Sequence, residues 1–224
     1  MNRYIKNGIF TSEEMSILRS SNICIIGCGG LGGHILEMLA RLGVGNLTIV
    51  DGDVFDESNL NRQILSSESN IGKSKVMEAL KRIESINSDV VIKPINEFVT
   101  GENVNDIIKS SELVIDALDS IDDRKILAHA CESSNKIMIH GAIAGWYGQV
   151  STIYPGDKTI DRLYPSKHKK GVEVSLGNPS FTPALIASIQ VSEALKVITS
   201  KPHTLRNKIM YIDLLYNDFE VIEI

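Results

Sequence analysis

The sequence predicts an α/β fold, with a Rossmann-like, mostly parallel sheet flanked by helices and an antiparallel C-terminal portion. Two observations lead to this prediction. Up to Tyr154, short apolar runs of strand character alternate with segments of helical periodicity, a pattern typical of parallel strands joined by crossover helices. The chain then ends with two short strand-like segments separated by a turn, which predict a hairpin.

The first elements surround a glycine-rich segment. Residues 12–20 predict a short amphipathic helix with Ser12 as its N-cap. The run 23–27 (ICIIG) is apolar and β-rich, so it predicts a buried strand. Helical spacing of apolar residues follows over 31–42, and residues 47–51 (LTIVD) predict a second buried strand.

The later elements continue this alternation and then depart from it. We expect helices near 72–86 and 122–134, and strands over 90–95, 113–116, 137–140 and 149–154. Residues 155–180 hold three of the six prolines and a basic cluster at 167–170, and they predict a long loop. The remaining expected elements are an apolar helix over 184–199 and the hairpin strands 208–213 and 218–223.

Composition limits the classes of function. The 224 residues are 43% hydrophobic and 23% charged, with a formal net charge of −5, as in an ordinary globular domain. An acidic balance argues against nucleic acid as a partner, because phosphate binding normally needs a basic face. No apolar run reaches the roughly 20 residues of a membrane span, and the N-terminal segment lacks the apolar stretch of a signal peptide. We therefore expect a cytoplasmic protein that binds neither nucleic acid nor membrane.

The three cysteines are interpreted as buried thiols. Cys24, Cys28 and Cys131 are an odd number, and the first two lie in or beside an apolar segment, which is unlike a disulfide framework. Three thiolates cannot supply a four-cysteine zinc site, and the chain has no C-x-x-C pair. We expect no zinc.

A glycine motif predicts a nucleotide site after the first strand. Residues 27–32 (GCGGLG) match G-x-G-x-x-G between a strand and a helix, where free backbone N–H groups can meet a phosphate. Asp51 ends the second strand about 20 residues further on, where a carboxylate can hold ribose hydroxyls. The cofactor-binding residues predicted from this motif are Gly27, Gly29, Gly30, Leu31, Gly32 and Asp51.

The following segment favours ATP over a nicotinamide cofactor. Residues 59–63 (NLNRQ) and 72–75 (GKSK) add fixed cations beyond the expected ribose site. An enzyme that splits a triphosphate needs such cations, because negative charge develops on the transferred and leaving phosphates. Arginine can contact a phosphate with two parallel hydrogen bonds, and lysine adds a point charge. An NAD-linked oxidoreductase stays as an alternative.

Together these motifs resemble the ubiquitin-activating-enzyme-like adenylyltransferases of the ThiF/MoeB/HesA family. The segments GCGGLGG, IVDGDVFDESNLNRQ, GKSKV, VIDALDS and GAIAGWYGQV carry the resemblance, which covers nearly the whole chain. It implies a single ThiF-type adenylation domain over 1–224, with an N-terminal helical arm (1–20), a nucleotide-binding core (21–154), a crossover loop (155–183), and a C-terminal helix and hairpin (184–224). It also implies ATP and Mg²⁺ as cofactors, and adenylation of the C-terminal Gly-Gly carboxylate of a small ubiquitin-like sulfur carrier in a thiamine, molybdopterin or related pathway.

The resemblance assigns roles to individual residues. Asp51 matches the ribose-binding aspartate, Lys75 matches a phosphate-facing lysine, and Asp119 matches the aspartate linked to Mg²⁺. Asp53 can either support the site or be structural. Residues matching the phosphate loop of the family are Asn59, Arg62 and Gln63.

The resemblance also implies a homodimer. Asn2-Arg3 stands where the family has Asn-Arg-Gln, with Tyr4 in place of the glutamine, so Arg3 is expected to reach the neighbouring active site. Arg3, Arg62, Lys75 and Asp119 are thus the predicted catalytic residues.

Some features leave alternatives open. The expected loop over 155–183 has no cysteine, so we expect adenylation without covalent transfer to this chain, with sulfur supplied by a separate sulfurtransferase or by attack on the free acyl-adenylate. A non-catalytic, partner-binding member of the fold is a further alternative.

His140 ends a predicted strand at the edge of the sheet where ligands bind. Its side chain can either pack in the core or line the site, and the sequence does not decide between these positions.

Overall fold

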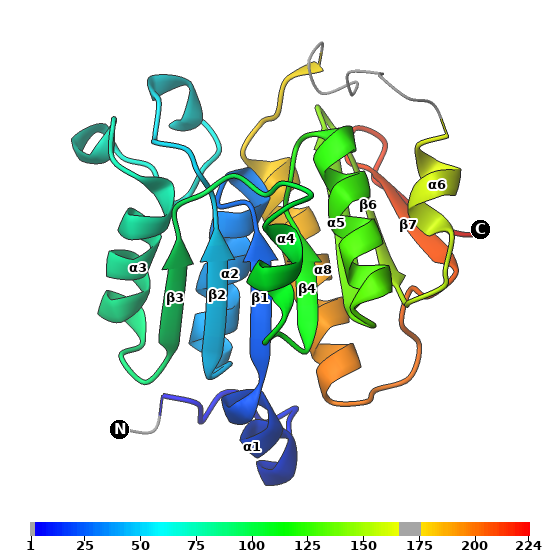
Figure 1. The fold of residues 1–224 in the computed structure, drawn as a ribbon, viewed down its shortest axis with the longest axis horizontal. Coiled ribbons are helices and arrows are strands. Elements are labelled where there is room, and N and C mark those ends of the chain that lie inside the picture. Colours follow the sequence, from blue (N-terminus) through cyan, green and yellow to red (C-terminus); the bar gives the residue numbers. More distant parts are fainter. Residues whose placement is uncertain (1–2, 166–175) are drawn as a thin grey trace.

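A computed structural model describes residues 3–165 and 176–224 and confirms the predicted fold class. One eight-stranded sheet has the order β3-β2-β1-β4-β5-β6-β7-β8, with parallel pairing from β3 to β5 and antiparallel pairing from β5 to β8 (Figure 1). The strands are β1 (Asn22–Ile26), β2 (Asn46–Val50), β3 (Val91–Ile95), β4 (Leu113–Asp116), β5 (Ile137–Ala144), β6 (Tyr147–Ile153), β7 (Lys208–Asp213) and β8 (Asp218–Glu223).

Helices cover both faces of this sheet. In Figure 1, α4 and α5 lie in front of the strands, whereas α2 and α8 lie behind them. The helix α1 lies below the sheet, at the end opposite the arrowheads of the parallel strands. The described helices are α1 (Ser12–Ser20), α2 (Gly30–Leu42), α3 (Lys75–Ile86), α4 (Val104–Ile108), α5 (Ile121–Ser133), α6 (Thr159–Leu163) and α8 (Phe181–Ile198), with short 3-10 turns η1 (Glu57–Asn59) and η2 (Glu68–Asn70).

The central strands are buried on both faces, as their continuous apolar sequences predict. Successive residues of a strand point to opposite faces, so Ile23 and Ile25 of β1 pack with α2 and α8, whereas Cys24 and Ile26 pack with α4 and α5. Two hydrophobic cores result, one on each side of the sheet. These two cores fix the parallel strands in one sheet, so that their carboxyl ends lie side by side at the same edge.

Several predicted boundaries are corrected. The N-cap of α1 is Thr11, not Ser12, and its hydroxyl accepts a hydrogen bond from the Glu14 amide. The third helix begins at Lys75, not at residue 72, because Ser74 has a non-helical backbone and forms a β-bridge with Val54. The predicted loop over 155–183 contains the short helix α6, and its basic cluster at 167–170 lies outside the described residues.

One described helix, α8, is long and apolar enough to cross a membrane by length and composition alone. It packs along α2 and against β5 and β6, with Ile186, Ala187 and Ala194 fully buried. The apolar sequence of α8 is therefore explained by its position as a core helix of the domain.

Candidate nucleotide-binding site

The candidate site is a large cavity at the carboxyl ends of the parallel strands, where open α/β sheets bind their ligands. Its volume is about 800 Å³. Residues from the ends of β1, β2 and β4 line one part, and residues from β5, β6 and β7 line another. Most of the predicted cofactor-binding residues meet on its wall, namely Gly27, Gly29, Gly30, Leu31, Asp51, Asp53, Arg62, Gln63, Lys75 and Asp119.

The glycine motif forms a tight turn from β1 into α2. Gly27 has φ +100°, and a Cβ atom there would lie 2.6 Å from the carbonyl oxygen of Ala117. A Cβ atom on Gly32 would lie 1.9 Å from the carbonyl oxygen of Gly27. Gly32 therefore does not line the cavity, but it allows the helix to pack closely on the turn. The turn brings the N-terminus of α2, with its unpaired N–H groups, to the cavity.

Asp51 is fixed by the backbone around it. One carboxylate oxygen accepts a hydrogen bond from the Cys28 amide at 2.7 Å, and the other accepts one from the Asp53 amide at 2.9 Å. These bonds link the end of β2 to the glycine turn. The carboxylate stands between that turn and the rest of the cavity, a position suited to ribose hydroxyls.

Arg62 and Gln63 reach the cavity from the turn that follows η1. The Arg62 guanidinium donates to the Ser58 carbonyl and to the Asn61 side-chain oxygen, both at 2.9 Å. Gln63 is buried, and its Oε1 has no hydrogen-bond partner among the described residues. Asn59 was predicted to bind the cofactor, but it does not line the cavity. Its side-chain oxygen accepts the Asp56 amide at 3.1 Å and so closes the turn that carries Arg62.

Lys75 brings a buried positive charge to the site. Its ammonium lies 3.0 Å from the Asp53 carboxylate, and the two side chains are 7% and 56% exposed. A buried ammonium is costly without a partner, so Asp53 compensates the charge of Lys75. The triphosphate of a bound nucleotide could take over this compensation.

Asp119 stands on the loop after β4 and is exposed at the cavity wall. Asp123, on the first turn of α5, and Glu97, after β3, also line the cavity and were not predicted. Within the described ranges, no group of three or more His, Cys, Asp and Glu residues could hold a metal ion by itself. Mg²⁺ usually needs only one or two carboxylates besides phosphate oxygens and water, so the donor chemistry of Asp119 fits this ion.

Phe98 and Arg124 are among the further cavity-wall residues that the sequence interpretation missed. Phe98 follows β3 and packs over Gly52, where a Cβ atom would lie 2.7 Å from its ring. Arg124 is buried at 5% exposure, and it donates to the Tyr164 hydroxyl at 3.1 Å and to the Leu118 carbonyl. In the sequence, Arg124 could have been recognised as a site residue only from its charge and from its position on a helix that begins two residues after Asp119.

Arg3 lies far from this cavity within its own chain. Its guanidinium donates to the Asn87 side-chain oxygen and lies 4.0 Å from the Asp89 carboxylate. Asn87 ends α3 just before β3 begins, so this contact is at the amino ends of the strands. Tyr4 holds the same segment in place, since its hydroxyl accepts a hydrogen bond from Asn87 at 2.8 Å.

The three cysteines are buried, as predicted. Burial raises the pKa of the Cys24 and Cys131 thiols to about 12, and it raises the pKa of the Cys28 thiol as well. All three are therefore protonated near neutral pH and poor nucleophiles.

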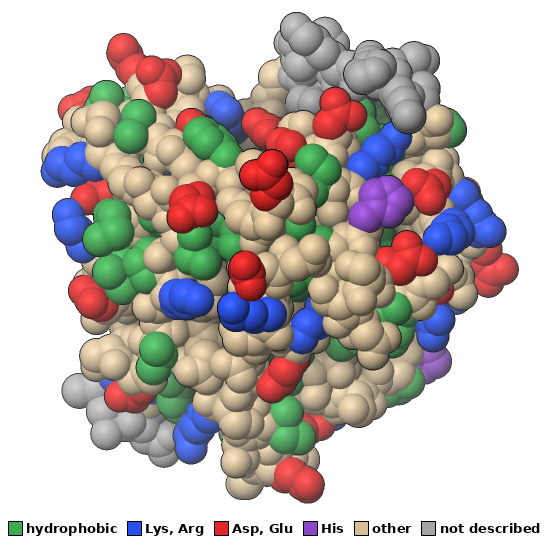
Figure 2. Space-filling view, in the orientation of Figure 1, with side chains coloured by type: hydrophobic (Ala, Val, Ile, Leu, Met, Phe, Trp, Pro, Cys, Tyr) green, Lys and Arg blue, Asp and Glu red, His purple; other side chains and the backbone are tan. Residues whose placement is uncertain are grey.

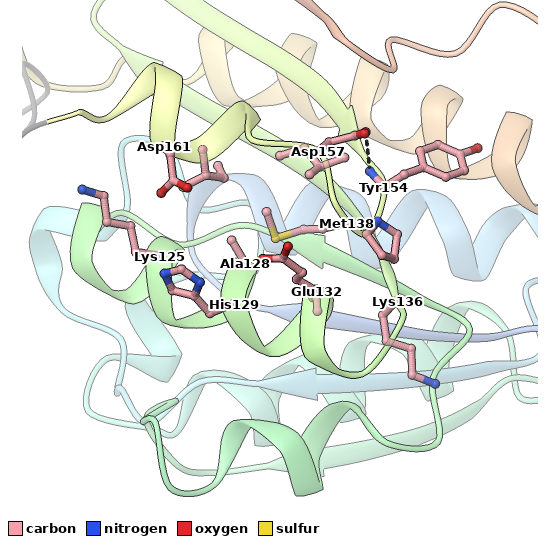
Figure 3. Close-up of a pocket in the computed structure, with 13 residues that line it drawn as sticks. Lys125, Ala128, His129, Glu132, Lys136, Met138, Tyr154, Asp157 and Asp161 are labelled. Carbon is pink, nitrogen blue, oxygen red and sulfur yellow. Dashed lines mark hydrogen bonds between the residues drawn. The ribbon is translucent and has the colours of Figure 1, made fainter.

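A second pocket lies between α5 and α6 (Figure 3). Polar and charged side chains, including those of Lys125, His129 and Asp161, surround it, but its volume is only about 30 Å³. This is room for about one water molecule, not for a nucleotide. On the face shown in Figure 2, acidic and basic side chains are interspersed and form no continuous basic stripe.

Comparisons with known proteins show which family this chain belongs to. The sequence profile of the ThiF family matches residues 1–224. The SAMP-activating enzyme E1 of Haloferax volcanii is 30% identical over 94% of this chain and 79% of the relative. A probable molybdopterin-synthase adenylyltransferase of Porphyra purpurea is 33% identical over 99% of this chain and 60% of the relative. Among solved structures, E. coli MccB in complex with AMPCPP and MccA superposes with a TM-score of 0.85 at 20% identity, over 99% of this chain and 71% of that chain.

Proposed function

This chain belongs to the ThiF family and is an adenylyltransferase, and we propose that it activates the C-terminal Gly-Gly carboxylate of a small ubiquitin-like sulfur carrier. The observation that carries the proposal is the convergence of Arg62, Lys75 and Asp119 on the cavity that also holds the glycine turn and Asp51. Arginine and lysine beside an acidic residue suit a triphosphate with a cation, whereas a nicotinamide cofactor does not need them.

The proposed reaction needs no nucleophile from the enzyme. A carboxylate oxygen of the carrier attacks the α-phosphorus of ATP, and the bond from that phosphorus to the oxygen bridging to the β-phosphate breaks. Pyrophosphate leaves, and the acyl-adenylate remains on the carrier. Because a carboxylate is already ionised at neutral pH, a general base is also unnecessary. The protein contributes position and charge neutralisation.

Each site residue has a defined part in this reaction. The α2 N-terminus and Asp51 hold the nucleotide, while Arg62 and Lys75 neutralise the charge that develops on the leaving pyrophosphate. Asp119 would hold Mg²⁺ against the phosphates, where the ion lowers the charge of the triphosphate when bound. The triphosphate would replace Asp53 as the partner of Lys75, so Asp53 keeps the lysine in place before ATP arrives.

We further propose a homodimer in which Arg3 completes the site of the partner subunit. Sulfur would reach the acyl-adenylate from a separate sulfurtransferase or by direct attack, because the three cysteines described above are buried and protonated. Zinc has no part in this proposal.

The decisive test is ATP–pyrophosphate exchange with a panel of small carriers that end in Gly-Gly. We expect exchange that depends on one carrier, together with the mass of one added adenylate on that carrier by intact mass spectrometry. Exchange that is absent with every carrier would count against this substrate class.

A binding measurement separates the alternative classes. An adenylyltransferase should be stabilised against heating by ATP and not by NAD, whereas an NAD-linked oxidoreductase should respond to NAD. A non-catalytic partner-binding member should bind a partner without any exchange activity.

A further inference from the structure

A polar network with a fully buried centre lies beside the cavity, and the proposed reaction does not use it. Its centre is the pair Asp116 and His140, whose side chains are both 0% exposed. Nδ1 of His140 lies 2.7 Å from Oδ2 of Asp116. Neither residue lines the cavity, but Arg124, Gln149 and Tyr164, which surround them, all do.

The hydrogen atoms of this network can be assigned. Burial lowers the pKa of His140, so the ring is neutral. Burial alone would raise the pKa of Asp116, but Arg124 and His140 hold it below its usual range, so this carboxyl is ionised. Nδ1–H of His140 therefore donates to Asp116, and Nε2 is an acceptor that faces the Tyr164 hydroxyl at 3.2 Å and the Gln149 amide nitrogen at 3.3 Å. The same hydroxyl accepts from Gln149 at 2.8 Å and from Arg124 at 3.1 Å, so both of its lone pairs are used.

The network holds the backbone of Leu118, in the loop after β4, from two sides. Oδ1 of Asp116 accepts the Leu118 amide at 3.0 Å, and the Arg124 guanidinium donates to the Leu118 carbonyl. Both backbone polar groups of Leu118 are thus occupied, and the next residue is Asp119. Behind the loop, the Gln190 side chain of α8 donates to the Asp116 carbonyl at 2.8 Å and fixes the end of β4.

We propose that His140 is a positioning residue that acts through Asp116 and Leu118 to aim the Asp119 carboxylate into the cavity. The Asp116 carboxylate gives one oxygen to Leu118 and the other to His140, and Nε of Arg124 lies 4.0 Å from the second oxygen. Without the bond from His140, Arg124 alone would face the second oxygen, and the carboxylate could turn away from Leu118. The inference rests on the proposed function in one respect, which is that Asp119 holds the Mg²⁺ of the bound ATP.

The position of the pair argues against a purely structural explanation. A buried carboxylate such as Asp116 gains little net stability from its partners, because the cost of removing the charge from water offsets much of the attraction. Stability alone therefore does not explain why Asp116 and His140 are buried here. Groups behind metal ligands orient those ligands, and their loss typically costs about 10-fold to 100-fold in metal affinity. A network that ends on the backbone of Leu118, the residue before Asp119, is placed to have this effect.

The test compares ATP affinity with and without Mg²⁺ by calorimetry in three variants. His140→Leu removes the donor, His140→Gln moves the polar group toward the Nε2 position, and His140→Asn keeps an N–H donor near the Nδ1 position. We expect the gain in affinity from Mg²⁺ to fall about 10-fold or more in the first two variants and to stay near wild type in His140→Asn. Affinity for metal-free ATP should be unchanged in all three. Should His140→Leu not fold, His140→Gln carries the same expectation.

Asp119→Asn removes the proposed metal ligand, so it shows how small the gain in ATP affinity from Mg²⁺ becomes without that ligand. This variant also separates the metal assignment of Asp119 from the positioning inference for His140. An unchanged Mg²⁺ effect in Asp119→Asn would overturn the metal assignment in the proposed function. The positioning inference is then decided by amide hydrogen exchange at Leu118, which should accelerate in His140→Gln and not in His140→Asn. Equal exchange in both variants, or an equal Mg²⁺ effect in wild type and His140→Gln, would overturn the positioning inference.

Discussion

Arg62 is placed to act on a phosphate because the backbone of its own turn holds it. Ser58 and Asn61 fix the guanidinium, and Asn59 closes the turn beneath it. The side chain is therefore oriented before any nucleotide binds, and preorganised charge is what stabilises a transition state most effectively.

We predict that Arg62→Ala lowers the rate of ATP–pyrophosphate exchange by about 10²–10³-fold, as expected for the loss of one preorganised donor. Arg62→Lys should recover only part of this loss, because an ammonium cannot make two parallel hydrogen bonds to a phosphate. The matched control is Lys73→Ala, an exposed cation of the same region that does not line the cavity. Exchange in Arg62→Ala equal to that of the control would exclude the role of this arginine.

His140 also links stability to pH. Its folded pKa lies below the ordinary value of 6.5 because of burial, while Asp116, Arg124 and Tyr164 are the ionisable groups that face it. As pH falls, the unfolded chain takes up the proton first, so stabilisation that is complete above pH 6.5 is lost as pH falls toward the folded pKa.

We predict that melting temperatures measured between pH 7.5 and 5.5 fall less steeply in His140→Asn than in wild type. His34→Asn is the control, because burial lowers the pKa of His34 too but leaves this side chain partly exposed at the surface of α2. A slope that changes more in His34→Asn than in His140→Asn would contradict the assignment.

At the scale of elements, the glycine turn between β1 and α2 serves two purposes. It lets the strand and the helix pack closely, and it forms part of the proposed nucleotide site. The strand β1 and the helix α2 can be joined this tightly only if Gly27 adopts a positive φ and Gly32 has no side chain. The free N–H groups that result are the same groups that would meet a phosphate.

We predict that Gly32→Ala lowers the free energy of unfolding by about 1–3 kcal/mol, because its Cβ atom would overlap the Gly27 carbonyl oxygen and force the turn to move. Gly101→Ala is the control, since nothing lies within 4 Å of the Cβ atom it adds. Urea denaturation measures both variants, and equal unfolding midpoints would contradict the packing argument.

The elements also show what the sequence could predict. The hairpin strands 208–213 and 218–223 were predicted with their observed bounds, because a turn separates two strand-like runs. The helix α6 was missed since five residues do not establish a helical period. The positions of Arg62, Lys75 and Asp119 around one cavity followed from motifs, whereas Phe98 and the network of Arg124, His140 and Tyr164 depend on contacts between distant segments.

At the scale of the whole molecule, Arg3 and the nucleotide cavity lie at opposite ends of the sheet. Arg3 contacts Asn87 at the amino ends of the parallel strands, and the cavity is at their carboxyl ends. In Figure 1 the amino ends face α1. Within one chain this arginine does not serve the cavity. A catalytic role for Arg3 therefore requires a second copy of the chain.

Mixed dimers can test this arrangement. Arg3→Ala leaves the cavity of its own chain intact. Lys75→Met removes the ammonium group from the cavity of its own chain and so inactivates that cavity, but it keeps Arg3. If Arg3 acts across the dimer, mixing the two weakly active variants restores one complete site in each mixed dimer, because the intact cavity receives the partner's arginine. We therefore predict that exchange activity rises on mixing toward half of the wild-type rate per mixed dimer, with dimer mass checked by light scattering. An arginine that acted only on its own chain would leave the mixture as inactive as its components, and full activity of Arg3→Ala alone would remove the residue from the mechanism.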